Sequence, residues 1–173
     1  MNTKQKTNQK GFTIIEVMIV LAIAGLIMVV IFVAVPSLQR MGRNNALNSD
    51  MNNTLTAVGE YASNNGGSLP RGINPAFVSG SKTAVLANAS TGTPTGNPVT
   101  VKLNGSVTSL TVVTAGSLNT SSPVGNAQIV TGAAGKCNPD NTGLTGGGTT
   151  RSYAILYVAE SGTATNVLKC VGS

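Results

Sequence analysis

Histidine and tryptophan are absent from this chain of 173 residues, and cysteine occurs only twice. Without imidazole the chain lacks the side chain that most often serves as a general base near neutral pH and as a metal ligand. Two cysteines alone do not supply the four ligands of a structural zinc site. The sequence therefore argues against an enzyme, and we expect no cofactor and no metal site.

Charge is also scarce, because charged residues make up 9% of the chain and aromatic residues 3%. Half of the net charge of +6 comes from Lys4, Lys6 and Lys10, which stand at the start of the chain without a neighbouring acid. The other basic residues are scattered: Arg40, Arg43, Arg71, Lys82, Lys102, Lys136, Arg151 and Lys169. A nucleic-acid-binding surface usually gathers its basic residues on one face. The charge pattern therefore indicates a mildly basic surface.

Most of the hydrophobicity lies in one run, FTIIEVMIVLAIAGLIMVVIFVAV, at residues 12–35. As a helix this run is about 36 Å long, which is enough to cross a bilayer. The basic residues before it predict an N-terminus on the cytoplasmic side. The run is longer than the apolar region of a secretory signal, so we expect it to stay in the mature protein. Its single charge is Glu16, and a mid-bilayer carboxylate costs roughly 2.5–3.5 kcal/mol.

The residues around this carboxylate read KGFTIIE at positions 10–16. A short basic leader ends in Gly11, and Phe-Thr, two aliphatic residues, Glu16 and an unbroken apolar helix follow. This run resembles the leader junction of type IV prepilins, in particular the type IVa kind with GFTIIE. The resemblance is close over residues 1–35 and looser over the helix that follows.

The resemblance implies how the chain is processed. A membrane-embedded aspartyl prepilin peptidase would cut between Gly11 and Phe12 and methylate the new amino group of Phe12. A glycine fits closely against a peptidase active site because it has no Cβ. In a filament core, the Glu16 carboxylate can pair with the Phe12 ammonium of a neighbouring subunit. Such a pair fixes register more than it adds stability.

The helix is predicted to continue beyond the membrane as an amphipathic segment, residues 36–66. Apolar residues recur there at steps of three and four, which is typical of one buried helix face; they are Leu38, Met41, Leu47, Met51, Leu55, Val58 and Ala62. Polar residues, Asp50 among them, are expected on the other faces. The run Asn64-Asn65-Gly66-Gly67 predicts the end of the helix. One helix of about 54 residues, roughly 80 Å long, should result.

The segment from Gly25 to Pro36 is the weakest part of this predicted helix. It is rich in β-branched residues, and Pro36 removes a backbone donor. Type IV pilins usually carry a proline a few residues earlier, so the chain departs from the family pattern here. We hypothesise that this segment loosens when the helix packs into a filament.

Residues 67–173 show short apolar alternations typical of strands and are expected to form a head domain. Asn104-Gly105 predicts a hairpin over residues 99–113. Residues 127–131 form another predicted strand, and residues 152–160 and 163–170 a second hairpin around Ser161-Gly162. Gly- and Thr-rich stretches at 89–98 and 142–150 are predicted loops. The fold class is α+β, with a long helix packed on a small antiparallel sheet.

Cys137 and Cys170 both lie on the side of the membrane opposite the basic leader. In an oxidising compartment they are expected to form a disulfide. The closed ring would stabilise the fold by about 4 kcal/mol on the chain-entropy model. Pilins commonly close their C-terminal region in a similar way.

Together these features predict a type IV pilin precursor, held in the cytoplasmic membrane by one span and then assembled into an extracellular fibre for adhesion, twitching motility or DNA uptake. The implied partners are identical subunits, membrane lipid before assembly, the prepilin peptidase, an inner-membrane platform protein and an assembly ATPase. Two alternatives stay open. One is a pseudopilin or minor pilin of a secretion or competence system. The other is a membrane-tethered module that binds DNA, a carbohydrate or a host surface and never polymerises.

Overall fold

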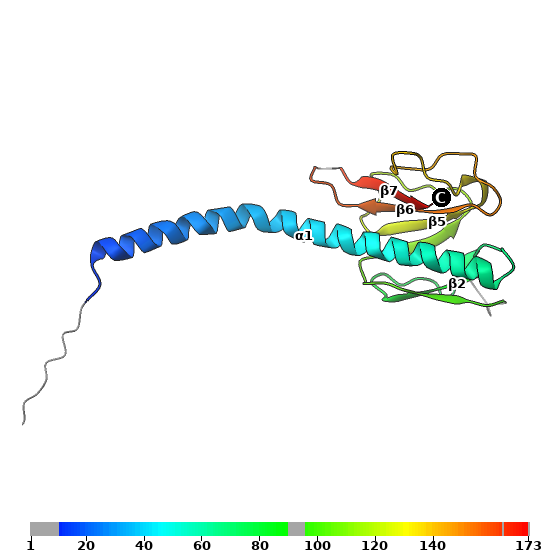
Figure 1. Cartoon of the computed structure of the whole chain (residues 1–173), viewed down its shortest axis with the longest axis horizontal. Helices are drawn as coiled ribbons and strands as arrows, with labels where there is room; N and C mark the ends of the chain where they lie inside the picture. Colours follow the sequence, from blue (N-terminus) through cyan, green and yellow to red (C-terminus); the bar gives the residue numbers. More distant parts are fainter. Residues whose placement is uncertain (1–10, 90–95, 164, 173) are drawn as a thin grey trace, which may run out of the picture. The chain divides into compact units, whose positions relative to one another are not determined.

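The computed structural model describes residues 11–89, 96–163 and 165–172, so residues 1–10 of the basic leader lie outside the described part. The chain divides into two compact units, residues 1–39 and 40–173. Figure 1 shows one long helix, α1 (Ile14–Asn64), which is followed by strands. The elements after α1 are β1 (Gly72–Ile73), β2 (Thr83–Ala87), β3 (Val99–Lys102), β4 (Ser109–Val113), β5 (Asn126–Thr131), the 3-10 turn η1 (Gly132–Ala134), β6 (Tyr153–Ala159) and β7 (Val167–Gly172). The α+β class predicted from the sequence is confirmed.

Helix α1 has 51 residues and ends where the sequence predicts. Gly66 and Gly67 have φ angles of 64° and 83°, in the left-handed region that glycine adopts without strain. The Gly67 N–H donates to the Ala62 carbonyl at 2.7 Å, which satisfies a carbonyl at the end of the helix. The Asn-Gly cluster therefore ends the helix through a left-handed cap.

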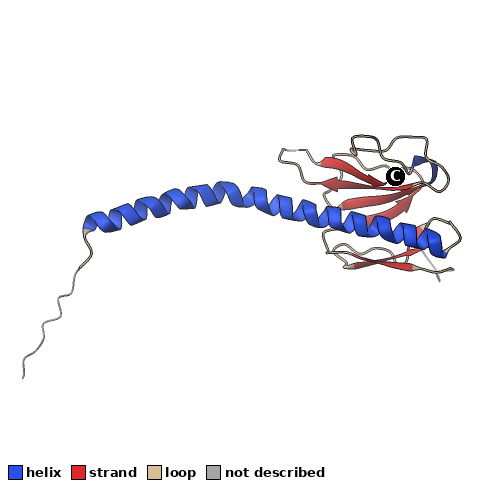
Figure 2. Cartoon of the chain, viewed as in Figure 1, coloured by secondary structure: helices blue, strands red, loops and turns tan. Residues whose placement is uncertain are grey.

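The strands form two sheets, shown in red in Figure 2. The first is antiparallel, in the order β1-β2-β3. The second has the order β4-β5-β6-β7, and it is mixed because β4 and β5 are parallel. The strand predicted at 127–131 is confirmed as β5, and the second predicted hairpin is confirmed as β6 and β7, although β7 begins later than expected. Strands β1 and β2 were not predicted.

The predicted hairpin over residues 99–113 is wrong. Strand β3 pairs with β2 in the first sheet, whereas β4 pairs with β5 in the second. Between them the chain crosses from one sheet to the other, with Gly105 at a φ of 86°. The Asn-Gly turn therefore redirects the chain between sheets. The prediction failed because long-range contacts to Asn104 outweigh its local hairpin preference.

The core lies between the second half of α1 and the two sheets. It includes Leu47, Met51 and Val58 of the predicted stripe, with Leu86 and Ile155 opposite, and all five are at most 1% exposed. The stripe is shorter than predicted, because Leu38 and Met41 remain 65% and 60% exposed. Apolar spacing alone does not show where the sheets begin to cover the helix. Leu38 and Met41 are therefore corrected to exposed positions.

Asp50 is fully buried, although the sequence placed it away from the packed face. Its Oδ1 accepts hydrogen bonds from the backbone N–H of Asn104 at 2.7 Å and from the Asn104 Nδ2 at 2.8 Å. Its Oδ2 has no hydrogen-bond partner among the described residues. Burial raises the pKa of Asp50, and the hydrogen bonds from Asn104 act in the opposite direction. This carboxylate fixes the crossing between β3 and β4 to the helix.

A second contact holds the β6–β7 turn against α1. Arg43 donates to Glu160 through Nε at 2.6 Å and through Nη2 at 2.8 Å. Asn44 adds two bonds to the Glu160 backbone, each 2.9 Å long. The hydrogen bond from Arg43 holds the pKa of Glu160 below its usual value. Because the ion pair is largely exposed, it orients the turn more than it stabilises the fold.

We predict that Asp50→Ala lowers the free energy of unfolding by about 1–3 kcal/mol, because both Asn104 donors lose their acceptor. Asp50→Asn keeps one amide oxygen for them and should change stability by less than about 1 kcal/mol at pH 7. Unfolding of the full chain in detergent can be followed by tyrosine fluorescence, because Tyr61 and Tyr157 are buried.

Wild type and Asp50→Asn should also differ in how the free energy of unfolding depends on pH. A raised folded-state pKa at Asp50 stabilises the protein below the unfolded pKa, and this stabilisation is lost as pH rises through the folded pKa. Wild type should therefore gain stability relative to Asp50→Asn as pH falls from 7 toward 4. Glu160 has the opposite sign but is present in both proteins, so it cancels in the comparison. A difference that stays constant with pH would contradict the assignment.

Candidate assembly site

The predicted cleavage point lies in an exposed, non-helical segment directly before α1. Gly11, Phe12 and Thr13 precede the first helical residue, and the Phe12 side chain is 86% exposed. A Cβ built on Gly11 would meet no atom within 4 Å. The fold itself therefore does not require glycine at position 11, and the bond between Gly11 and Phe12 is accessible to another protein.

Glu16 folds back onto the start of the helix. Its Oε2 accepts hydrogen bonds from the Thr13 backbone N–H at 3.3 Å and from the Thr13 hydroxyl at 3.2 Å. The Glu16 N–H donates in turn to the Thr13 Oγ1 at 3.4 Å. This reciprocal arrangement is a capping box, in which a Thr before the helix and a Glu three residues later satisfy each other's backbone donors.

This cap was not predicted, although its signal is present in the sequence as Thr-x-x-Glu before an apolar run. The cap gives the Glu16 carboxylate local donors at the head of an apolar helix. All three bonds are exposed and longer than the usual 2.9–3.0 Å, so they are weak. The carboxylate is therefore satisfied in the single chain but is easily released to a stronger donor.

The apolar run behind this cap has no cover within the chain. Among the described residues, helix α1 is long and apolar enough to span a membrane. The mean hydropathy of its most apolar stretch is 3.2, and none of that stretch is buried. Large side chains stay exposed on all sides of it, including Ile14, Ile15, Met18, Leu21, Leu26, Met28, Val30, Phe32 and Val33. This surface must be covered by lipid or by other protein.

Gly25 and Pro36 lie inside α1, which is continuous through both in the single chain. A Cβ on Gly25 would meet nothing within 4 Å, so no close contact explains the glycine. The helix brings neither residue near Phe12 or Glu16. Each residue adds about 1.5 Å along the helix axis, so Gly25 and Pro36 lie well away from the start of the helix. The loosening of this segment stays a prediction.

Cys137 and Cys170 form a disulfide, with their Cα atoms 5.7 Å apart. The bond ties the segment after η1 to strand β7. The Cys170 N–H also donates to the Asn141 carbonyl at 2.8 Å. The loop that follows Cys137 is therefore attached to β7 at two points. Around it a small second core forms from Val130, Ala154 and Leu156. The disulfide therefore belongs to the packing of the second unit and is remote in sequence from the leader junction.

Residues 6–32 match the family model described as the prokaryotic N-terminal methylation motif, which is the leader signature of type IV pilins. The chain carries a type IV pilin leader. This leader indicates a structural protein made as a membrane-anchored precursor, of the pilin-like or pseudopilin kind. No curated protein and no solved structure is significantly similar to the chain. The match ends within the apolar run, so it does not cover the second unit.

We predict that Gly11→Leu blocks removal of the leader, because a branched side chain next to the scissile bond prevents close approach of the peptidase. The site is open in the chain itself, so the change should leave α1 intact. Intact mass of the protein from cells with an active prepilin peptidase measures processing. Gly25→Leu is the matched control, since that position is equally open, and it should be processed normally. Normal processing of Gly11→Leu would refute the prediction.

Proposed function

We propose that this chain is the precursor of a type IV pilin, a structural subunit that polymerises into a surface fibre. The observation that carries the proposal is the segment of residues 12–35, which is apolar, uncovered and headed by a pilin leader. Removal of residues 1–11 would free Phe12 as the new N-terminus, ready for methylation. The same surface that lies in lipid before assembly would lie against neighbouring helices afterwards.

The exchange of lipid for protein changes the hydrophobic free energy of the segment little. Burying one large aliphatic side chain from water is worth about 1.5–3 kcal/mol, so the segment cannot stay in water. Lipid tails are as apolar as leucine, so helices in a bilayer gain little from the hydrophobic effect when they associate. Packing among identical helices keeps the segment dry outside the membrane. An input of work by the assembly ATPase and the inner-membrane platform would then draw subunits from lipid into the fibre.

Glu16 supplies the register in this proposal. After cleavage, Phe12 carries a positive charge that the precursor lacks at this position. The weak bonds between Glu16 and Thr13 leave the carboxylate able to pair with the Phe12 ammonium of a neighbour. Two charges in an apolar core are tolerated only when they meet with good geometry, so a subunit in the wrong register is rejected.

The unit of residues 40–173 would form the outer surface of the fibre, where its disulfide keeps the C-terminal region closed. Adhesion, twitching motility and DNA uptake are the uses that such a fibre would serve. The subunit would reside in the cytoplasmic membrane before assembly and outside the cell afterwards.

The segment from Gly25 to Pro36 would loosen when subunits pack, which allows the fibre to extend. Its β-branched residues and Pro36 give the weakest helix propensity along α1. We predict that a filament reconstruction shows non-helical backbone within this segment. A helix that remains continuous through residues 25–36 in the fibre would rule the idea out.

The proposed function is tested on material sheared from the cell surface. We expect an abundant chain that begins with N-methylated Phe12, detected by intact mass and N-terminal sequencing. Glu16→Gln keeps the shape of the side chain but removes its charge, so it should be processed normally and yet be lost from the sheared fraction. Glu60→Gln is the matched control, because Glu60 is an exposed acid of the same helix outside the apolar run.

The outcomes separate the candidate functions. A chain that begins with Phe12 but is confined to membranes would favour the pseudopilin or minor-pilin alternative. An intact Met1 start in cells with an active peptidase would contradict the proposal. Sheared fibres that still contain Glu16→Gln in normal amounts would contradict the register role alone.

A further inference from the structure

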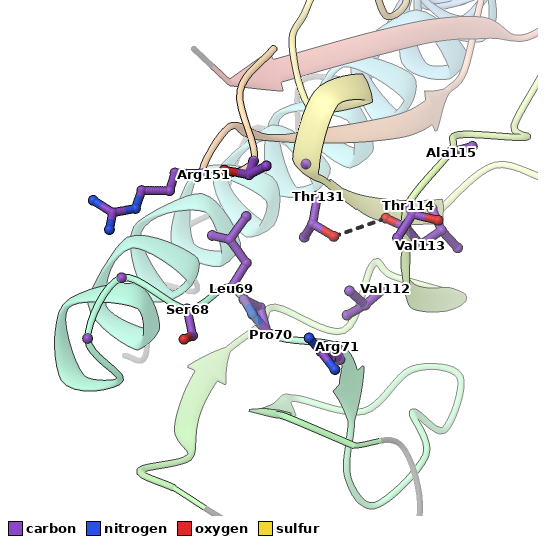
Figure 3. Close-up of a pocket in the computed structure, with 14 residues that line it drawn as sticks. Ser68, Leu69, Pro70, Arg71, Val112, Val113, Thr114, Ala115, Thr131 and Arg151 are labelled. Atoms are coloured by element: carbon purple, nitrogen blue, oxygen red, sulfur yellow. Dashed lines mark hydrogen bonds between the residues drawn. The ribbon is translucent and has the colours of Figure 1, made fainter.

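A wide groove opens in the unit of residues 40–173, where the two sheets meet without a shared ladder. Its volume is about 1010 Å³. One side is the segment that follows α1, from Gly66 to Arg71, and the other is the end of β4 with residues 114–115. Figure 3 shows Leu69 and Pro70 on the first side and Val112 on the other, with Arg151 and Arg71 near different ends of the Ser68–Arg71 segment.

The groove exposes a strand edge. Strand β4 is the outer strand of its sheet, and β5 pairs with only one of its edges. The two-residue strand β1 runs beside β4, but no ladder joins them. Beyond β1, the end of β4 at Val112 and Val113 faces the groove. An unpaired edge of this kind presents backbone donors and acceptors to an added strand.

The groove also carries positive charge without a matching acid. Arg71 and Arg151 are exposed. Neither takes part in the ion pair of the described part of the chain, which joins Arg43 to Glu160. The Arg151 guanidinium is held over Gly67, where a Cβ would lie 3.4 Å from its central carbon. The open position at Gly67 thus places one cation at one end of the segment, and Arg71 stands at the other end.

The remaining lining is apolar or hydroxylic. Leu69 and Val112 are half-buried, and Pro70 is buried. Thr131 is also buried, and its hydroxyl donates to the Val113 carbonyl at 3.4 Å. No lining residue is aromatic. Stacking of bases is therefore not available, and two cations are few for a nucleic-acid backbone.

We propose that this groove binds an extended acidic peptide segment of a partner protein by strand addition to β4. The peptide backbone pairs with the free edge of β4 at Val112, since the Val113 carbonyl points toward β5 and accepts from the Thr131 hydroxyl. Because successive side chains of a strand point to opposite faces, apolar residues of the peptide contact Leu69 and Val112 while acidic residues reach the two arginines. Arginine forks bind carboxylates in two-point geometry. This site goes beyond the proposed fibre and does not depend on polymerisation.

The test uses the full chain in detergent micelles and a fluorescent decapeptide of alternating glutamate and valine, with binding followed by anisotropy. A glutamine-valine decapeptide should bind at least about tenfold more weakly, since charge-assisted hydrogen bonds are lost. The glutamate-valine peptide N-methylated at alternate amides should weaken by a similar factor, because it keeps its charge but cannot pair along one edge. This comparison leaves the protein unchanged, so it does not depend on any variant folding.

The double variant Arg71→Gln and Arg151→Gln should also weaken binding of the glutamate-valine peptide by about tenfold or more. The double variant Lys102→Gln and Lys169→Gln is the matched control. It removes two exposed cations from strands β3 and β7, away from the groove, and should leave the affinity for the peptide unchanged. Equal loss in the control, equal binding of the N-methylated peptide, or no binding at all would overturn the proposal. Tighter binding of a decameric oligogalacturonate would overturn it in favour of an acidic glycan.

Discussion

The hydrogen bonds between the buried Asp50 carboxylate and Asn104 are the contact on which the arrangement of the second unit depends. They hold the chain against α1 at the point where it leaves β3. With the chain held there, β4 does not fold back onto β3 as a hairpin. It crosses instead to the second sheet and lies parallel to β5. This single buried acid therefore lies where the chain passes from one sheet to the other.

The same crossing creates the groove between the sheets. A hairpin of β3 and β4 would have covered one edge of β4 with its own neighbour. In the observed order β4 stands at the margin of its sheet, beside the two-residue strand β1, which pairs with β2 instead. The edge of β4 at Val112 is therefore left open beside the groove that carries Arg71 and Arg151.

The sequence predicted the features that depend on local residue order. The apolar run, the Asn-Gly end of α1 and the hairpin of β6 and β7 can all be read from neighbouring residues. Apart from the disulfide, the specific contacts that depend on distant partners were missed. Asp50 looked like a surface acid because its partner lies 54 positions away. The parallel pairing of β4 and the short strand β1 have no local signal at all. The Thr13–Glu16 cap is a different case, since its pattern was visible and was not used.

If the chain polymerises as proposed, the apolar segment and the second unit are under different physical constraints. Residues 12–35 must fit against identical copies of themselves, so any change there meets the same change in every neighbour. The Phe12 amine and the Glu16 carboxylate must also meet in one register. The second unit has only to keep its own core and disulfide closed, and its outer surface is free to serve a particular partner. Such constraints would account for the match of the leader and the start of the helix to a known motif, whereas the groove and the two sheets depend on this chain's own tertiary contacts.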